Sequence, residues 1–177
     1  MINYKKISKK SSHIELFREL YVANFPDSER REWPAVMQLM RDEPRFHVII
    51  AEDGGLTAGF VSYWNFDDFN YIEHLAVDAN QRNQGTGSQL VNQIMSLASP
   101  VVLEVEPPTT AAACKRVCFY QRLGLVLHDD VEYMQPPYGP GKPWVPLQLM
   151  TSPGMSREDI ERAVTTLHRE VYHKANQ

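Results

Sequence analysis

The chain of 177 residues is long enough for one domain with a sizeable core, and its 43% hydrophobic and 23% charged residues are ordinary for a globular protein. A net charge of -4 argues against a general nucleic-acid binder. No apolar run approaches the roughly 18 residues that a membrane helix needs, and the lysine-rich N-terminus lacks the apolar core of a signal peptide. We therefore expect a cytoplasmic protein with no nucleic-acid and no membrane partner.

Alternating and helical patterns of apolar residues predict twelve elements along the chain. They are a strand at 2–7, a helix between Ser12 and Pro26, a helix from Ser28 to Pro44, strands at 46–52, 56–65 and 71–77, a helix from about Gly87 to Ala98, a strand at 101–106, a helix at 109–123, strands at 125–134 and 145–150, and a helix capped by Ser156. The turn Asp53-Gly54-Gly55 is a strong hairpin signal, so the strands at 46–52, 56–65 and 71–77 are expected to form an antiparallel meander.

Cysteine and histidine patterns do not predict a metal site. The 2 cysteines, Cys114 and Cys118, are four residues apart in a predicted helix, which places them on one face but supplies too few ligands for zinc. We interpret them as small buried side chains. The 6 histidines are scattered without metal-ligand spacing.

The most informative stretch is the strand, turn and helix from Tyr71 to Ala98. A helix that begins directly after a strand directs the unpaired N–H groups of its first turn outward, and its dipole adds partial positive charge there. Gly85 and Gly87 lack a Cβ, so an anion such as phosphate could approach the backbone closely, and Arg82 could add charge. The segment lacks the Gly-Lys-Ser/Thr of a P-loop, and Leu90 stands where the dinucleotide fingerprint needs its third glycine.

The pattern Arg82-x-x-Gly85-x-Gly87 between an apolar strand and an amphipathic helix resembles the acyl-CoA-binding motif of the GNAT-type N-acetyltransferases. The resemblance covers about Tyr4 to Met150 and implies that acetyl-CoA is the cosubstrate, with its pyrophosphate in the loop and its pantetheine arm along a bulged strand. It implies the following cofactor-binding residues: Leu75, Ala76, Val77, Arg82, Asn83, Gln84, Gly85, Thr86, Gly87 and Ser88. Asn83 stands where the family usually has glycine, and asparagine tolerates unusual backbone angles well.

The segment Phe119-Tyr120-Gln121-Arg122-Leu123-Gly124-Leu125 is similar to the family motif that ends the following helix. The resemblance implies that Tyr120 is the general acid that protonates the leaving thiolate of coenzyme A. A phenol of pKa about 10 is a reasonable proton donor to a thiolate of pKa about 8.5. A packed core tyrosine is the alternative. The asparagine that many members carry seven residues earlier is Ala113 here, so that cofactor contact is expected to be weaker or to come from a neighbour.

The amine that attacks the thioester must first lose a proton, and the strands beside the acyl group offer three glutamates. The resemblance implies Glu104 or Glu73 as the general base, and we do not rank one above the other. Glu106 is better explained as a solvent-facing carboxylate at a strand end, and His74 as a packed residue. Aromatic residues on segments that could surround the acceptor are Trp33, Tyr63, Trp64, Tyr138 and Trp144.

The order of elements, compared with that family, implies an α/β (α+β) fold. We expect one mixed, mostly antiparallel sheet of about seven strands with helices on both faces, plus a C-terminal helix. Residues 1–150 are predicted to be the acetyltransferase-like domain and 151–177 a helical extension packed on it, with a homodimer as a possible assembly. The predicted activity is direct acetyl transfer to an amine of a small molecule or peptide in a ternary complex. The alternatives are a coenzyme A-binding sensor that does not catalyse, and an interaction protein that binds another phosphate ligand.

Overall fold

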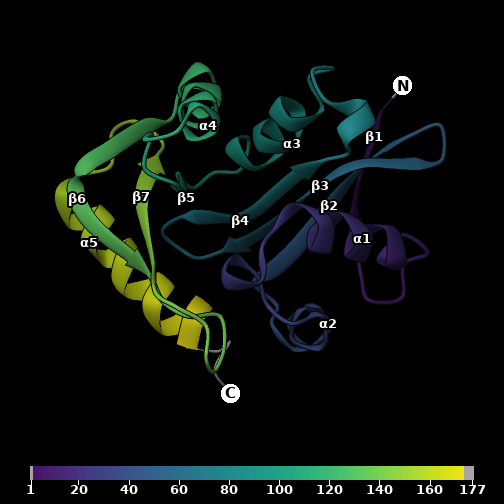
Figure 1. Cartoon of the computed structure of the whole chain (residues 1–177), viewed down its shortest axis with the longest axis horizontal. Coiled ribbons are helices and arrows are strands. Elements are labelled where there is room, and N and C mark those ends of the chain that lie inside the picture. The colour runs from purple at the N-terminus through teal and green to yellow at the C-terminus, as the bar shows by residue number, and fades with distance from the viewer. Residues whose placement is uncertain (1, 174–177) are drawn as a thin grey trace. The chain divides into compact units, whose positions relative to one another are not determined.

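A computed structural model describes residues 2–173, which form five α-helices and seven strands, labelled in Figure 1. The strands pair in the order β1-β2-β3-β4-β5-β7-β6. The elements are β1 (Asn3–Ile7), α1 (Ile14–Asn24), the short turn η1 (Asp27–Glu29), α2 (Trp33–Asp42), β2 (Phe46–Asp53), β3 (Leu56–Asn65), β4 (Asn70–Val77), η2 (Ala79–Gln81), α3 (Thr86–Met95), β5 (Val101–Val105), α4 (Ala111–Arg122), β6 (Val126–Gln135), β7 (Val145–Thr151), α5 (Arg157–Thr166) and the π-helical segment η3 (Leu167–Tyr172). The expected seven-stranded sheet with a C-terminal helix is confirmed.

The chain divides into two compact units. One comprises Met1–Pro26 and Glu32–Ser99, and the other comprises Asp27–Arg31 and Pro100–Gln177. The connector between α1 and α2 therefore belongs to the same unit as the C-terminal half of the chain. The predicted boundary near residue 150 stays a prediction, and residues 174–177 of the predicted extension lie outside the described part.

In the first unit, β1 to β4 pair antiparallel in sequence order, which confirms the predicted meander. Helices cover both faces of this sheet, as the neighbouring residues Gly59 and Phe60 on β3 show. The Phe60 ring packs on Phe17 of α1 with centroids 4.7 Å apart, whereas a Cβ at Gly59 would lie 3.4 Å from Leu90 of α3. Because successive strand residues point to opposite faces, α1 and α3 lie on opposite sides. Seven consecutive β3 residues, 58–64, are accordingly buried.

In the second unit, β7 pairs antiparallel with both β5 and β6. The β6–β7 register shifts between His128 and Tyr133, so β6 carries an irregularity in its middle. The last helix begins with a capping box. Ser156 accepts a hydrogen bond from the Asp159 N–H, and the Asp159 carboxylate accepts one from Ser156 N–H. The predicted cap is therefore confirmed.

Two local predictions are wrong. The second helix begins at Trp33 and not at Ser28, because residues 27–29 form a separate 3-10 turn and Pro34 suits the first turn of the new helix. Cys114 and Cys118 are exposed and not buried. The buried face of α4 is formed by Ala113, Val117 and Tyr120, and each cysteine follows one of these residues by about 100° of helix rotation.

No helix within residues 2–173 is long and apolar enough to cross a bilayer. The same part of the chain contains no group of three or more histidine, cysteine, aspartate or glutamate residues arranged to hold a metal ion. The predicted cellular location and the predicted homodimer stay predictions.

Candidate active site

The loop between β4 and α3 is a sequence of tight turns that leads directly into a helix. Asp78 closes the end of β4 by accepting a hydrogen bond from the Asn80 N–H at 2.9 Å, and a 3-10 turn follows. Asn83 and Gly85 then adopt left-handed conformations, with φ of 63° and 84°. Gly85 is the N-cap of α3, and no side chain caps the helix there. The first turn of α3 therefore has no side-chain cap for its N–H groups, and their role in binding an anion stays a prediction.

Arg82 braces this loop. Its Nε donates to the Val77 carbonyl at 3.3 Å, and one terminal nitrogen donates to the Asn24 side chain of α1 at 3.1 Å. The guanidinium is exposed and carries five N–H donors, so it can contact an anion while it keeps these two bonds. The predicted role of Arg82 as a phosphate ligand remains a prediction.

The first residue of α3 contributes an unusual buried hydroxyl. Thr86 is 1% exposed, and its Oγ1 has no hydrogen-bond partner among the described residues. A buried hydroxyl without a partner costs free energy. The start of α3 therefore holds a polar group with unused hydrogen-bonding capacity, next to Gly87 and Ser88.

The pairing of β3 with β4 contains a bulge at Glu73. Ser62 of β3 pairs with His74, whereas the next β3 residue, Tyr63, pairs with Ile72, so Glu73 has no opposing residue on β3. Its carboxylate accepts a hydrogen bond from the indole N–H of the buried Trp64 at 2.8 Å. The alternation of side chains between the two faces of β4 is therefore interrupted at this position. The sequence pattern alone does not reveal this interruption.

Glu104, the other predicted base, lies on β5 opposite Leu149 of β7. It is half-buried, and each of its two carboxylate oxygens accepts a phenol hydroxyl. Tyr172 donates to Oε2 at 2.5 Å, and Tyr133 donates to Oε1. Neither tyrosine is singled out by the sequence, because one lies 68 and the other 29 residues from Glu104.

Tyr120, the predicted acid, is buried on α4 beside Phe119, with ring centroids 4.9 Å apart. Burial raises the pKa of its phenol to about 12, and the nearby Arg116 opposes this only partly. The phenol therefore stays protonated throughout the neutral range. Arg116 itself forms an ion pair with Glu106, and Glu106 is about half-exposed, which agrees with its interpretation as a strand-end carboxylate.

The predicted site residues fall into two sets. Glu73 and Leu75–Val77 lie on β4, and residues 82–88 form the end of the following loop and the first turn of α3, all in the first unit. Glu104 and Tyr120 belong to β5 and α4 of the second unit. Each set is described within its own unit, and the roles of all these residues remain predictions.

Most of the candidate acceptor-site aromatics are packing residues. Trp64 is fully buried against Phe46 and Phe66, and Tyr63 is also buried. Tyr138 is buried beneath Arg31, whose guanidinium lies 4.7 Å from the ring centroid. Two of the candidates keep solvent contact: Trp33, which is half-buried at the start of α2, and Trp144, which is 55% exposed.

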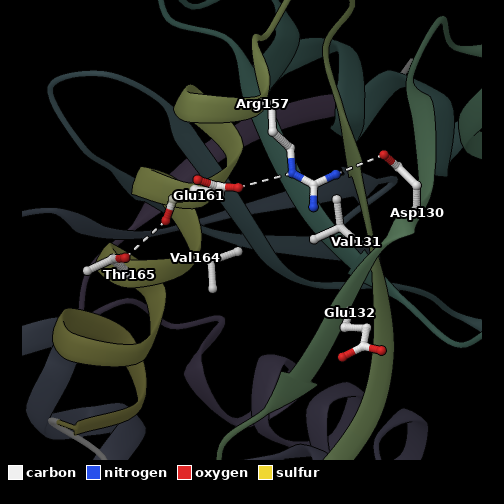
Figure 2. Close-up of a pocket in the computed structure, with 7 residues that line it drawn as sticks. All are labelled: Asp130, Val131, Glu132, Arg157, Glu161, Val164 and Thr165. Carbon is white, nitrogen blue, oxygen red and sulfur yellow. Dashed lines mark hydrogen bonds and ion pairs between the residues drawn. The ribbon is translucent and has the colours of Figure 1, made fainter.

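A separate open hollow of about 590 Å³ lies between β6 and α5 (Figure 2). Arg157 crosses it, bonded to Asp130 at 2.8 Å and to Glu161 at 3.1 Å. Four of its seven lining residues are charged, and none of the predicted acetyl-transfer residues contributes to it. It is therefore not the site of the predicted chemistry.

Comparisons with known proteins identify a matching family model and solved structures that resemble this chain. The family model described as acetyltransferase (GNAT) matches residues 13–125. A solved GNAT-family structure from Bacteroides thetaiotaomicron, provisionally titled an acetyltransferase, is 36% identical, covers 96% of this chain and 98% of its own, and superposes with a TM-score of 0.88.

Two further relatives are more distant. The YjbC protein of Bacillus subtilis, whose name provisionally assigns it as an acetyltransferase, is 30% identical over 84 residues. That match covers 46% of this chain, and the chain spans only 38% of that relative's length. The structure of Arabidopsis thaliana NAA60 in complex with acetyl-CoA is 16% identical, covers 85% of this chain and 97% of its own, and has a TM-score of 0.64, which shows a shared fold.

Proposed function

The chain belongs to the acetyltransferase (GNAT) family, and on that premise we propose that it moves an acetyl group from acetyl-CoA to an amine of a small molecule or peptide. The transfer is direct, in a ternary complex, without a covalent enzyme intermediate. The observation that carries this proposal is the uncapped N-terminus of α3 behind two left-handed residues, Asn83 and Gly85.

The start of α3 is suited to hold the pyrophosphate of acetyl-CoA. The N–H groups of residues 85–88 supply donors, the helix dipole favours negative charge, and Arg82 adds a cation. The buried Thr86 hydroxyl offers one more donor at the same helix end. Leu75, Ala76 and Val77 hold the pantetheine arm in this proposal, and a backbone N–H of this strand stabilises the oxyanion that forms at the thioester carbonyl.

The reaction forms one bond and breaks one. The deprotonated amine nitrogen attacks the thioester carbon, the tetrahedral intermediate collapses, and the carbon–sulfur bond breaks with the electron pair leaving on sulfur. Tyr120 donates a proton to this thiolate and is reprotonated from solvent. Burial of Tyr120 keeps its phenol protonated and so able to donate. Burial also raises the free energy of the tyrosinate that remains after donation, which limits how much complete proton transfer can accelerate the reaction.

A glutamate accepts the proton that the amine loses. Glu104 and Glu73 are both candidates, because both are half-buried carboxylates on strands beside the cofactor motifs and both accept hydrogen bonds from aromatic side chains. A carboxylate whose charge is held by such donors can still take a proton through a bound water. Turnover and acetyl-CoA binding of Glu104→Gln and Glu73→Gln identify the general base. The variant that loses the base should turn over more slowly and still bind acetyl-CoA as tightly as the wild type.

Calorimetry with acetyl-CoA tests the binding half of the proposal. We expect binding to the wild type and its loss in Gly87→Val, because the new side chain would stand at the anion site. Gln93→Val, which changes an exposed residue of the same helix, should bind normally. No binding to the wild type would overturn the proposal.

A screen of amines, polyamines, amino acids and peptides with acetyl-CoA tests the catalytic half, with free thiol as the readout. Release of thiol that depends on an amine supports the enzyme. Cofactor binding without transfer to any amine class would instead identify a coenzyme A-binding sensor.

A further inference from the structure

Two buried aromatic side chains from distant parts of the second unit meet at one carboxylate. Glu104 on β5 accepts the Tyr172 hydroxyl on Oε2 at 2.5 Å and the Tyr133 hydroxyl on Oε1. Tyr172 is completely buried and Tyr133 is 5% exposed, whereas Glu104 remains half-buried. The residue therefore keeps some contact with solvent, and each of its carboxylate oxygens accepts one of the two hydroxyls.

Strand β6, which carries Tyr133, has an irregular pairing with β7 just before this residue. The register between β6 and β7 is regular from Val126 to His128 and resumes at Tyr133, opposite Leu147. The irregularity between these points changes which residues of β6 face β7. An irregular strand of this kind re-aims side chains, and here it accompanies the Tyr133 contact with Glu104.

The segment that carries Tyr172 is held firmly. The chain leaves α-helical geometry after Thr166 and forms the π-helical segment Leu167–Tyr172. Arg31, itself buried, donates to the Val171 carbonyl at 2.9 Å, and the Tyr138 ring packs on Tyr172 with centroids 5.0 Å apart. Short π-helical pieces within helices occur frequently at functional sites.

The residues around Arg31 are also tied down. Lys142, in the loop of residues 136–144 between β6 and β7, donates to the backbone carbonyls of Asp27 at 2.9 Å and Arg30 at 2.8 Å. The loop therefore holds the connector that carries Arg31, and Arg31 holds the turn that carries Tyr172. The position of the Tyr172 hydroxyl is thus set by three separate segments of the unit.

We propose that Tyr133 and Tyr172 are positioning residues that orient the carboxylate of Glu104 as the general base, and that placing Tyr172 is the function of the C-terminal segment 157–172. This inference rests on the proposed function and decides between its two candidate bases. One hydroxyl on each oxygen fixes the plane of the carboxylate, and these two hydrogen bonds use only part of the about four acceptor sites of an ionised carboxylate.

The opposite reading is that Glu104 merely satisfies two buried hydroxyls and has no part in the reaction. The two readings differ in what removal of a hydroxyl does. In either case the Glu104 carboxylate takes up its proton at higher pH once a hydroxyl is removed, because its charge is less stabilised. Only a positioned base would also lose turnover and shift the acidic limb of the rate profile together with that titration.

The test compares Tyr172→Phe and Tyr133→Phe, each of which removes one hydroxyl and keeps the ring. Tyr4→Phe on β1 is the matched control, since Tyr4 has no hydrogen bond to the described residues through its hydroxyl. Glu104→Gln is the reference for loss of the base. The readouts are kcat and KM for the best amine across pH, and the ¹³C titration of glutamate carboxyls, with the Glu104 signal assigned by its absence in Glu104→Gln.

We expect kcat to fall about tenfold in each phenylalanine variant at unchanged KM for acetyl-CoA, because a hydrogen bond to a charged group is worth about that factor. We also expect the acidic limb of the rate profile and the Glu104 titration to move together, upward by about one pH unit. The control should match the wild type. Should Tyr172→Phe fail to fold, Tyr133→Phe provides the same comparison on its own.

Three results would overturn the inference. Full activity of Glu104→Gln would show that Glu104 is not the base, although acetyl transfer would stand. If Glu104→Gln is inactive but both phenylalanine variants keep the wild-type turnover and the wild-type acidic limb of the rate profile, Glu104 would remain the base and the positioning role would be refuted. A wild type that transfers no acetyl group would refute the proposed function itself, and the ¹³C titration would then report only whether the two hydroxyls govern the carboxylate.

Discussion

Gly59 on β3 lies so close to Ala76 on β4 that a Cβ at residue 59 would meet the Ala76 carbonyl oxygen at 2.7 Å. The same Cβ would lie 3.3 Å from the Val77 Cα and 3.4 Å from a methyl group of Leu90 on α3. The two backbone contacts cannot move aside as a flexible side chain would. The absence of a side chain at Gly59 therefore allows α3 to pack closely on the strand predicted to hold pantetheine.

We expect Gly59→Ala to lower the free energy of unfolding by about 1–3 kcal/mol, the usual cost of forcing an extra group into a packed core. Because the displaced atoms belong to Ala76 and Val77, we also expect weaker acetyl-CoA binding. Chemical denaturation and calorimetry measure the two effects. Leu56→Ala, at an exposed end of the same strand, should change neither. A Gly59→Ala variant as stable as the wild type would contradict the close packing.

Sequence patterns predicted the order of elements well because each element carries its own local signal. The hairpin Asp53-Gly54-Gly55 has glycines at φ of 57° and 86°, and Ser156 forms the cap that its position indicates. The start of α2 was harder to predict, because Ser28 to Glu32 are as compatible with a polar turn as with a helix start. The contacts of Arg31 with Val171 and Tyr138 explain why residues 30–32 do not continue into a helix.

The candidate site could be predicted only where its residues are consecutive. In the loop from Arg82 to Ser88, the left-handed angles occur at Asn83 and Gly85, residue types that adopt such angles readily. The residue types alone therefore predict this local geometry. The bulge at Glu73 and the hydroxyls on Glu104 depend on pairing between segments far apart in the chain. No local period records such pairings, so neither could be predicted from the sequence.

Replacement of Tyr120 tests the acid role. We expect Tyr120→Phe to bind acetyl-CoA normally and to lower kcat about 10²-fold, the lower end of what a positioned proton donor contributes. Because the pKa of Tyr120 is raised to about 12, we expect no loss of wild-type activity from its ionisation below about pH 10. Steady-state kinetics across pH measure both. Tyr63→Phe, another buried tyrosine, should retain full activity. Unchanged turnover of Tyr120→Phe would remove the acid assignment.

Asn83 offers a test of the loop backbone. Its φ of 63° lies in the left-handed region, which asparagine and glycine tolerate and β-branched residues avoid. Asn83→Gly should therefore bind acetyl-CoA as the wild type does, whereas Asn83→Val should bind it about tenfold more weakly, for a strain of 1–2 kcal/mol. Calorimetry compares the two. Equal affinities would show that the exposed Asn83 does not hold the loop for the anion.

Two half-buried histidines, His47 and His168, make stability depend on pH. Burial lowers the pKa values of His168 and His47 below the usual 6.5, and Lys6 adds to the effect at His47. The Nε2 atom of His168 is buried without a hydrogen-bond partner among residues 2–173, between the rings of Tyr133 and Trp144. Protonating His168 would place a charge among these rings.

Below pH 6.5 the unfolded chain therefore binds more protons than the folded chain, so the stability present above that pH is lost as the pH falls. We expect the free energy of unfolding to decrease between pH 7 and pH 5, and the double variant His47→Gln/His168→Gln to show a shallower decrease. The exposed His173→Gln should keep the wild-type slope. Urea denaturation at several pH values gives the slopes, and an equally steep decrease in the double variant would assign the acid sensitivity to other groups.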